Sequence, residues 1–261
     1  MSSQKTKLTN ELEAYLDIEH QAGKHTVYQK IARSVLSKIH DPRQQTAARY
    51  EEERFNYIKT FVSLNQASVI DIGCNLGYFS FSALEEGARQ VTCYEGYKKH
   101  AEFVEKAAVL IDAQEKFTVK AEYYDFGADN MRYDVAFLLN VLHHVGDDYG
   151  DKNTTRDKAK ELIALQMNNM AAVAKTLVFQ LGFNWRGDRY LPLFEQGSKD
   201  EIIDFVSQAT QHDWEIQTVG IAVKSNSGII EYREQNESNR RRDDALGEFL
   251  NRPLFIMKKK T

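Results

Sequence analysis

One short segment constrains the fold of this chain more than any other, because it joins an apolar strand pattern to a glycine turn. Residues 68–72 read Ser-Val-Ile-Asp-Ile, the turn Gly-Cys-Asn-Leu-Gly occupies residues 73–77, and a helical pattern follows at residues 78–86. A second apolar run, residues 91–94, ends directly before Glu95. This order of strand, turn, helix and strand predicts a βαβ unit and therefore an α/β fold.

The turn and Glu95 also indicate a ligand. At Gly73 and Gly77 no Cβ stands in the way, so the backbone can approach a bound molecule closely. In open α/β sheets, ligands bind at the carboxyl ends of the strands, and an acidic side chain there can accept both hydroxyls of a ribose. Glu95 has that position, so we expect the βαβ unit to bind a nucleoside.

The spacing of the glycines distinguishes two kinds of nucleotide-binding turn. A dinucleotide site has the pattern G-x-G-x-x-G, which this turn lacks. The sequence Asp71-Ile-Gly73-Cys-Asn-Leu-Gly77 instead resembles the D/E-x-G-x-x-x-G motif of the class I S-adenosylmethionine-dependent methyltransferases. The resemblance implies S-adenosylmethionine as the cofactor and a methyl-transferring enzyme. An ordinary βα turn without a ligand is the alternative.

The resemblance covers about residues 50–260, because further strand patterns follow in the order that this family has. It implies a Rossmann-like, seven-stranded methyltransferase sheet with helices on both faces. The strands expected after the βαβ unit are residues 117–124, 133–144 together with a loop, 176–182, 214–223 and 252–257.

Residues 1–60 are expected to form a helical extension before the methyltransferase domain, which spans residues 61–261. Helical patterns occur in this extension at residues 8–22, 26–39 and 46–61. In small-molecule methyltransferases such helices commonly lie over the cofactor as a lid. Solvated helices or a dimerisation surface are the alternatives.

A second departure from a minimal domain is an insertion at about residues 224–251, between the last two expected strands. It is far longer than a hairpin turn and rich in charge. We expect an extra strand near Ile229 and a short helix after the cluster of Arg240, Arg241 and Arg242. Acidic residues follow that cluster at once, which favours a solvated face over a phosphate grip.

Carried onto this sequence, the resemblance implies a set of cofactor contacts at the ends of the first four strands. Asp71 suits the ammonium of the cofactor, directly or through water, and the end of the third strand lies where the family contacts adenine. The expected cofactor-binding residues are Asp71, Gly73, Cys74, Asn75, Gly77, Tyr78, Phe79, Glu95, Gly96, Glu122, Tyr123 and Asn140.

The chemistry of methyl transfer points to the loop after the fourth strand. Attack on the sulfonium methyl is an in-line displacement, so the enzyme must align the nucleophile and remove its proton where necessary. His143 and His144 are the candidates for the general base, because an imidazole titrates near neutrality. His144 is preferred because it lies deeper in the loop, and a structural role for either histidine is the alternative.

Specificity is expected in the loop after the fifth strand, at residues 182–194. The expected substrate-binding residues there are Asn184, Trp185, Arg186 and Arg189. Aromatic faces stack on rings, and arginine forks hold carboxylate or phosphate, so the mixture suits a polar, ring-shaped or anionic acceptor. The alternative is a surface loop that Trp185 and Phe194 anchor in the core.

We expect no metal ion. Asp147, Asp148 and Asp151 have a spacing that suits Mg²⁺, but an ordinary polar loop explains them better. No set of cysteines and histidines completes a zinc site. The two cysteines, Cys74 and Cys93, are expected to be reduced packing residues.

The acceptor is expected to be a carbohydrate, a glycan terminus or a similar small polar metabolite, methylated on oxygen. The histidine pair and the loop at 182–194 look similar to methyltransferase domains that act on bacterial surface polysaccharide. A tRNA-modifying methyltransferase is an alternative, but the net charge of −4 argues against nucleic acid as a partner. An inactive, cofactor-binding regulatory subunit is another, although the acidic pair Asp71 and Glu95 counts against it.

Composition sets the remaining limits. The chain has 261 residues, 42% of them hydrophobic, which is enough for one α/β domain with a continuous core. The amino terminus is polar and charged, and no apolar run is long enough to span a membrane. A cytoplasmic location is therefore predicted, and an oligomer is left open.

Overall fold

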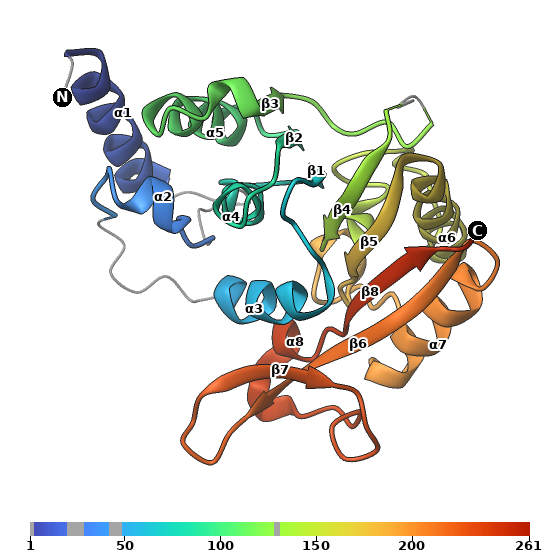
Figure 1. The fold of residues 1–261 in the computed structure, drawn as a ribbon. Helices are drawn as coiled ribbons and strands as arrows, with labels where there is room; N and C mark the ends of the chain where they lie inside the picture. Colours follow the sequence, from blue (N-terminus) through green and yellow to red (C-terminus); the bar gives the residue numbers. More distant parts are fainter. Residues whose placement is uncertain (1–2, 20–28, 42–48, 128–130) are drawn as a thin grey trace. The chain divides into compact units, whose positions relative to one another are not determined.

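The structure is a computed structural model that describes residues 3–19, 29–41, 49–127 and 131–261 (Figure 1). Its contacts divide the chain into two compact units, which are described one at a time. Unit 1 comprises Met1–Phe55 and Ser63–Tyr124, and unit 2 comprises Asn56–Val62 and Asp125–Thr261. The domain boundary between residues 60 and 61 stays a prediction.

Unit 1 contains the predicted βαβ unit. Its three strands are β1 (Ser68–Ile72), β2 (Gln90–Tyr94) and β3 (Phe117–Lys120), which pair in parallel in the order β3-β2-β1. All five residues of β1 are buried, including the polar Ser68 and Asp71, as expected for a central strand covered on both faces. Helix α4 (Tyr78–Glu85) joins β1 to β2, and α5 (Lys98–Leu110) with the single turn η1 (Gln114–Lys116) joins β2 to β3.

Of the amino-terminal helices of unit 1, the first begins before its predicted start at residue 8, and the second is shorter than the sequence predicts. Helix α1 (Ser3–Glu19) packs on α5 through the rings of Tyr15 and Phe103, whose centroids lie 5.5 Å apart. Of the second predicted helix only α2 (Arg33–Leu36) forms within the described residues; its predicted start, and that of the third helix, lie outside them. The Ser37 hydroxyl donates to the Ser34 carbonyl, a local bond that competes with the helical pattern.

Helix α3 (Glu51–Phe61) belongs to both units, because Glu51–Phe55 falls in unit 1 and Asn56–Phe61 in unit 2. In unit 2 the Tyr57 ring packs against Gly220, where an added Cβ would meet the ring at 2.5 Å. The Tyr57 hydroxyl shares a 2.6 Å hydrogen bond with Thr218. The apolar stripe predicted for this helix is therefore partly used against the sheet of unit 2.

The sheet of unit 2 has five strands in the order β4-β5-β8-β6-β7. Strands β4 and β5 are parallel, whereas β8 runs antiparallel to both of its neighbours, β5 and β6. The strands are β4 (Tyr133–Leu139), β5 (Ala174–Gln180), β6 (Trp214–Lys224), β7 (Ile230–Glu234) and β8 (Leu254–Lys259). Strand β7 is the extra strand predicted in the insertion, so the described residues hold eight strands instead of seven.

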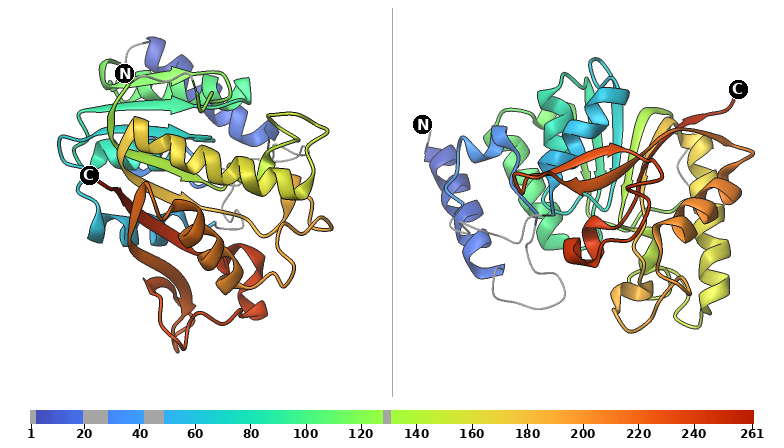
Figure 2. Two further views of the ribbon diagram at one scale, coloured as in Figure 1. Left: turned by 90° about the vertical axis from the view of Figure 1, so that its right-hand side faces the viewer. Right: turned by 90° about the horizontal axis from the view of Figure 1, so that it is seen from below.

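Two long helices cover the sheet of unit 2, and both views of Figure 2 place them side by side. They are α6 (Arg156–Val173) and α7 (Lys199–Thr210). Ser198 and Glu201 form a capping box at the start of α7, which satisfies backbone donors that the helix leaves open. The buried Trp214 indole donates to the Met167 carbonyl at 3.0 Å and so ties β6 to α6.

The loops of unit 2 carry short helical turns at the points where the sequence predicts functional residues. They are η2 (Leu142–His144), η3 (Trp185–Gly187), η4 (Asp244–Leu246) and α8 (Gly247–Leu250). The last of these is the short helix expected in the insertion. Among the helices that the structure describes, none is long and apolar enough to cross a membrane.

Candidate functional site

The glycine turn of unit 1 is held open by its backbone. Gly73, Asn75 and Gly77 all have positive φ, at 72°, 54° and 79°. The amides of Gly73 and Cys74 both donate to the Tyr94 carbonyl, at 2.8 and 3.1 Å, which fixes the turn to the end of β2. A Cβ at Gly77 would lie 2.9 Å from the Phe81 ring, so only glycine fits there without displacement.

Glu95 closes the same turn from the end of β2. One oxygen of its carboxylate accepts from the Asn75 amide at 2.8 Å, and the other accepts from the Tyr97 amide at 2.9 Å. These two bonds to backbone amides fix the carboxylate at the carboxyl end of β2, where open α/β sheets bind ligands. Glu95 thus lies where the sequence predicts it, and its contact with ribose stays a prediction.

Asp71 lies beneath the turn. Its side chain is buried and accepts a 2.6 Å hydrogen bond from the Ser80 hydroxyl on α4. Burial raises the pKa of Asp71 to about 7, although the Ser80 hydrogen bond opposes the shift and the Glu95 charge adds to it. This environment favours an indirect influence of Asp71 on the ligand, the second of the two roles that the motif implies.

The remaining predicted cofactor contacts of unit 1 fall into two groups. Cys74, Tyr78 and Phe79 are buried, so they shape the turn from below. Glu122 and Tyr123 are exposed after β3, and a Cβ on Gly96 would overlap the Tyr123 ring. The ring therefore stands over the bare backbone at Gly96, with 51% of the residue exposed. A flat aromatic face in this position suits stacking on a purine.

Both cysteines belong to this part of unit 1. Cys74 and Cys93 are free and buried, as the sequence predicts. The Cys93 thiol donates to the Ser80 hydroxyl at 3.2 Å, beside Asp71. The neighbouring Cys93 thiol and burial raise the pKa of Cys74, so it stays a protonated packing residue.

In unit 2, Asn140 ends β4 with a positive φ of 62°. Its side-chain amide donates to Gln180 at 2.9 Å and accepts from Arg252 at 2.8 Å. Gln180 in turn donates to the Arg252 carbonyl at 3.0 Å. These bonds close a ring of polar groups that fixes the Asn140 amide.

Arg252 and Glu248 are members of this network that the sequence analysis does not identify. The Arg252 guanidinium holds both carboxylate oxygens of Glu248, at 2.6 and 3.0 Å. Their separation of four residues is the spacing at which side chains on one helical face meet, so the signal was present in the sequence.

His143 is the more enclosed of the two candidate bases. It is buried, and its Nδ1 accepts from the Gly182 amide at 3.4 Å. Burial, together with the positive charges of His144 and Arg252, lowers the pKa of His143 well below its ordinary value. A neutral, enclosed imidazole fits the structural role that was weighed for one of the pair.

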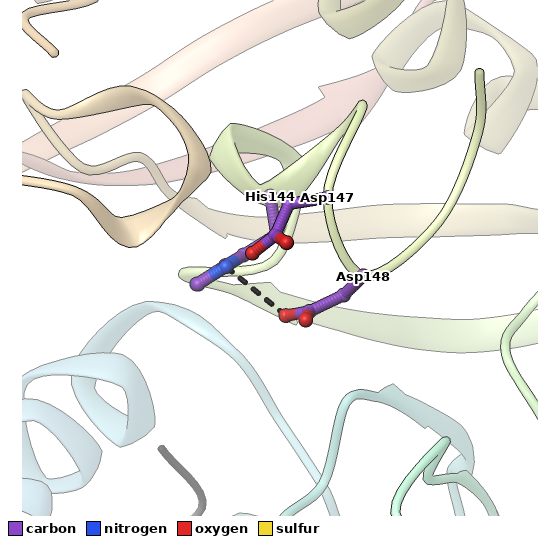
Figure 3. Close-up of side chains that lie close together, drawn as sticks. All are labelled: His144, Asp147 and Asp148. Atoms are coloured by element: carbon purple, nitrogen blue, oxygen red, sulfur yellow. Dashed lines mark ion pairs between the residues drawn. The ribbon is translucent and has the colours of Figure 1, made fainter. Parts of the chain in front are cut away.

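His144 is half-buried and lies against acidic neighbours (Figure 3). Its Nδ1 lies 3.1 Å from the Asp148 carboxylate, so the two groups form an ion pair when the imidazole is protonated. A Cβ at Gly187, which has a φ of 66°, would lie 2.9 Å from the His144 ring, so η3 packs directly on the imidazole. A carboxylate at Nδ1 leaves Nε2 to take a proton, which is the geometry that a general base needs.

His144, Asp147 and Asp148 also form the one group of at least three close metal-ligand side chains within the described residues, with ligand atoms inside 4.8 Å (Figure 3). Asp151 is directed elsewhere and accepts from the Asn153 amide at 2.9 Å. Hard cations such as Mg²⁺ prefer six oxygen ligands, of which this group supplies at most two. The expectation of no metal stays a prediction.

Two of the four predicted substrate contacts tie their loop to the loop after β4. The buried Trp185 indole donates to the Val145 carbonyl at 2.8 Å. Arg186 stacks over the Trp185 ring at 4.3 Å and donates to the carbonyls of Lys152 and Thr154, at 2.7 and 3.2 Å. This arrangement agrees with the alternative of an anchored loop.

The other two predicted contacts are more open. Asn184 is half-buried and Arg189 is exposed, with its guanidinium over the ring of Tyr190. Tyr190 is 74% exposed and was not singled out from the sequence. The outer end of this loop therefore presents an arginine and an aromatic ring to solvent.

The arginines of the insertion are engaged within unit 2. Arg240 forms an ion pair with Asp200 at 2.6 Å. Arg242 contacts Asp244 at 2.7 Å and the Gly197 carbonyl at 2.5 Å. These contacts agree with the predicted solvated face.

No protein-family model matches the chain. It is 33% identical over 98 residues to the tRNA U34 carboxymethyltransferase of Campylobacter jejuni, a stretch of 36% of this chain and 32% of that protein. The protein of the same name from Helicobacter acinonychis is 30% identical over 100 residues, or 35% of this chain and 36% of that protein. The chain thus matches about a third of the length of these curated relatives.

Solved structures align with a larger share of the chain than these curated relatives do. A structure of WbdD with a kinase inhibitor aligns with a TM-score of 0.59 and 12% identity, covering 95% of this chain and 47% of that one. An S-adenosylmethionine-dependent methyltransferase from Mesorhizobium loti aligns with a TM-score of 0.50 and 15% identity, covering 79% and 97%. Likeness at this identity concerns the fold, and it agrees with the α/β fold class expected from the sequence.

Proposed function

From the premise that the chain has the fold of the class I S-adenosylmethionine-dependent methyltransferases, we propose that it is such an enzyme and modifies a nucleoside in RNA. The observation that carries the proposal is the similarity, at 33% identity over 98 residues, to tRNA U34 carboxymethyltransferase. The carbohydrate acceptor expected from the sequence has no comparable support.

The assignment of the cofactor rests on unit 1. The turn at Gly73–Gly77 has glycines at both ends, Glu95 lies at the carboxyl end of β2, and Tyr123 offers an exposed ring beside Gly96. Each feature suits one contact with an adenosine. The glycines let the backbone approach the sugar, Glu95 suits the ribose hydroxyls, and the Tyr123 ring suits the purine face.

The proposed catalytic residue is His144 in unit 2. Bound S-adenosylmethionine would supply the methyl group, which the acceptor oxygen or nitrogen would take from the sulfonium, leaving S-adenosylhomocysteine with the electrons of the broken carbon–sulfur bond. The proton of the acceptor passes to Nε2 of His144, and Asp148 stabilises the resulting imidazolium through Nδ1. His143, which is buried, keeps the turn in place and takes no proton.

The assignment of the acceptor rests on the outer end of the loop after β5. Arg189 and the exposed Tyr190 ring can contact a phosphate and stack on a base. The net charge of −4 and the internal pairing of Arg240 and Arg242 leave few cations for a long phosphate track. Recognition of one exposed nucleoside in a folded RNA loop fits these features better than binding along a duplex.

The test is group transfer to unmodified tRNA, with nucleotide sugars as the parallel acceptor. The purified protein is incubated with S-adenosylmethionine, or with a donor that bears a carboxymethyl group, and the digested nucleosides are weighed by mass spectrometry. A nucleoside heavier by either group supports the proposal, and the mass gained identifies the group. Transfer to a nucleotide sugar alone would restore the carbohydrate acceptor. Cofactor binding without any transfer would favour the regulatory alternative.

A further inference from the structure

The start of α3 holds a buried acid and base in unit 1. Glu51 has no exposed surface, and Arg54 is 3% exposed. The nearest approach between them joins Glu51 Oε1 to Arg54 Nη2 at 3.9 Å, and neither oxygen of Glu51 accepts a hydrogen bond from another residue. Burying a carboxylate without donors is costly, so such a group calls for an explanation, and a missing ligand is one.

The pair lies at the amino-terminal end of α4. The Arg54 guanidinium stands over the Phe79 ring at 4.9 Å, and the Tyr78 amide donates to the buried Gln29 side chain at 3.1 Å. Tyr78 and Phe79 are the first two residues of α4 and directly follow Gly77. Arg54 therefore borders the turn to which the proposed function assigns the cofactor. Glu51 lies close enough to Tyr78 that burial and the charges of Glu52 and Glu51 raise the pKa of the Tyr78 hydroxyl.

The chemistry of the pair matches the amino-acid end of that cofactor. This end carries one ammonium and one carboxylate at close separation, and a guanidinium holds a carboxylate through two parallel hydrogen bonds. A carboxylate without hydrogen-bond donors is the complementary partner for an ammonium, which brings up to three. Asp71 is less suited to direct contact, because it is buried under the turn and bonded to Ser80.

We infer that Glu51 and Arg54 form the subsite for the amino-acid end of S-adenosylmethionine, with Glu51 receiving the ammonium and Arg54 the carboxylate. The inference rests on the proposed function for the identity of the cofactor. It transfers direct recognition of the ammonium from Asp71, to which the motif assigns it, to the first turn of α3. Bound cofactor supplies the hydrogen bonds that Glu51 lacks.

The charges around Glu51 agree with this role. Burial raises the pKa of Glu51, while Arg54, the backbone amide of Glu51 itself and, more weakly, Lys30 and Arg49 oppose the shift. Lys30 is itself engaged with the exposed Glu52 at 3.7 Å. A cationic ammonium would therefore strengthen the charged form of Glu51 more than any neighbour now does.

The experiment compares two ligands that differ in the amino-acid end. S-adenosylhomocysteine has it and methylthioadenosine lacks it, and calorimetry measures the affinity of each for the full chain. We expect Glu51→Gln to weaken S-adenosylhomocysteine binding about 10- to 100-fold and to leave methylthioadenosine binding unchanged. The matched control is Glu52→Gln, one residue away and exposed, which should change neither affinity.

Arg54 is tested by removing the group that it is proposed to hold. Arg54→Lys should weaken S-adenosylhomocysteine and leave decarboxylated S-adenosylmethionine, which keeps the ammonium, nearly unaffected. Thermal melts of each variant check that the fold is retained.

The outcomes separate the inference from the proposed function. Equal losses for both ligands in Glu51→Gln, or no loss for either, would overturn the subsite while leaving the cofactor assignment intact. A wild-type protein that binds neither ligand would overturn the proposed function itself.

Discussion

The glycine turn of unit 1 and the loop after β5 in unit 2 were both predicted to bind ligand, and they use their residues differently. In the turn, function depends on the backbone: positive φ angles at Gly73 and Gly77, and amides held by Glu95 and Tyr94. In the loop, the prediction depended on side-chain composition, and the Trp185 and Arg186 side chains are committed to internal contacts.

The difference has a physical origin. A left-handed turn with glycines tolerates few alternatives, so its sequence pattern specifies its geometry. Tryptophan and arginine stabilise a loop through the same stacking and charged hydrogen bonds that they use on ligands. Their presence in a loop therefore does not by itself distinguish a binding site from a brace.

The strongest way to sharpen the comparison is a change at His144, a half-buried loop residue of unit 2 with an acidic partner. His144→Ala should lower turnover about 10² to 10⁴-fold, because the acceptor proton loses its base. Affinity for S-adenosylhomocysteine should stay near the wild-type value, since that affinity is assigned to unit 1. Single-turnover kinetics and calorimetry measure the two quantities, and an unchanged rate would return His144 to a structural role.

A change at the glycine turn should instead affect cofactor affinity. Glu95→Ala should weaken S-adenosylhomocysteine binding by about 1.5 to 3 kcal/mol, the range for hydrogen bonds to a charged group. Part of that loss would come from the Asn75 and Tyr97 amides that Glu95 now holds. Glu102→Ala, an exposed change on α5, is the control, and equal affinities in the two variants would remove Glu95 from the site.

A pair of arginines tests whether the loop braces or binds. Arg186→Ala should cost about 1 to 2 kcal/mol of stability, because it removes hydrogen bonds to two carbonyls and the stack on Trp185. Arg189→Ala should change stability by less than about 0.5 kcal/mol and weaken acceptor binding. Chemical denaturation and acceptor titration separate the two, and a reversal of this pattern would make Arg186 the binding residue.

The buried Asp71 links the turn to pH. Its pKa is raised to about 7 in the folded protein from an unfolded value of about 3.9, so between these values the folded state holds more protons. Stability should therefore fall as pH rises through this window, by at most about 1.4 kcal/mol per pH unit from this group. Asp71→Asn should flatten that slope in a pH series of thermal melts, and an unaltered slope would assign it to other groups.

The smallest expected effect is at the acidic cluster of Figure 3. Chelating divalent ions should leave turnover unchanged, because His144 is proposed to act through Asp148 without a metal. If chelation lowered turnover, and if added Mg²⁺ restored it in the wild type but not in Asp147→Asn, then His144, Asp147 and Asp148 would be a metal site.

Much of the fold was accessible from the sequence, because the strands of the core are buried on both faces and read as apolar runs. The strand at Leu254–Met257 is an example, and β7 was expected near Ile229. The second amino-terminal helix was overestimated, because Ser34 and Ser37 make local and tertiary hydrogen bonds that a helical pattern does not reveal.

The candidate site could be predicted from the sequence only where one short segment contains all of its residues. The turn and Glu95 lie within one βαβ unit, so spacing alone brings them together. The ring of Asn140, Gln180 and Arg252 joins positions up to 112 residues apart, and no local pattern announces it. Glu51 escaped notice for a similar reason, because one acidic residue among three at the start of α3 differs from the others only in burial.

The two buried thiols give the turn a built-in probe. The chain has only two cysteines, and both lie in the immediate surroundings of the turn, so any thiol reagent that reacts with the native protein reports on local opening at that place. The labelling rate of the unmodified protein should fall as a ligand fills the turn. Occupancy could thus be followed in mixtures, without a substrate, a labelled cofactor or an engineered residue.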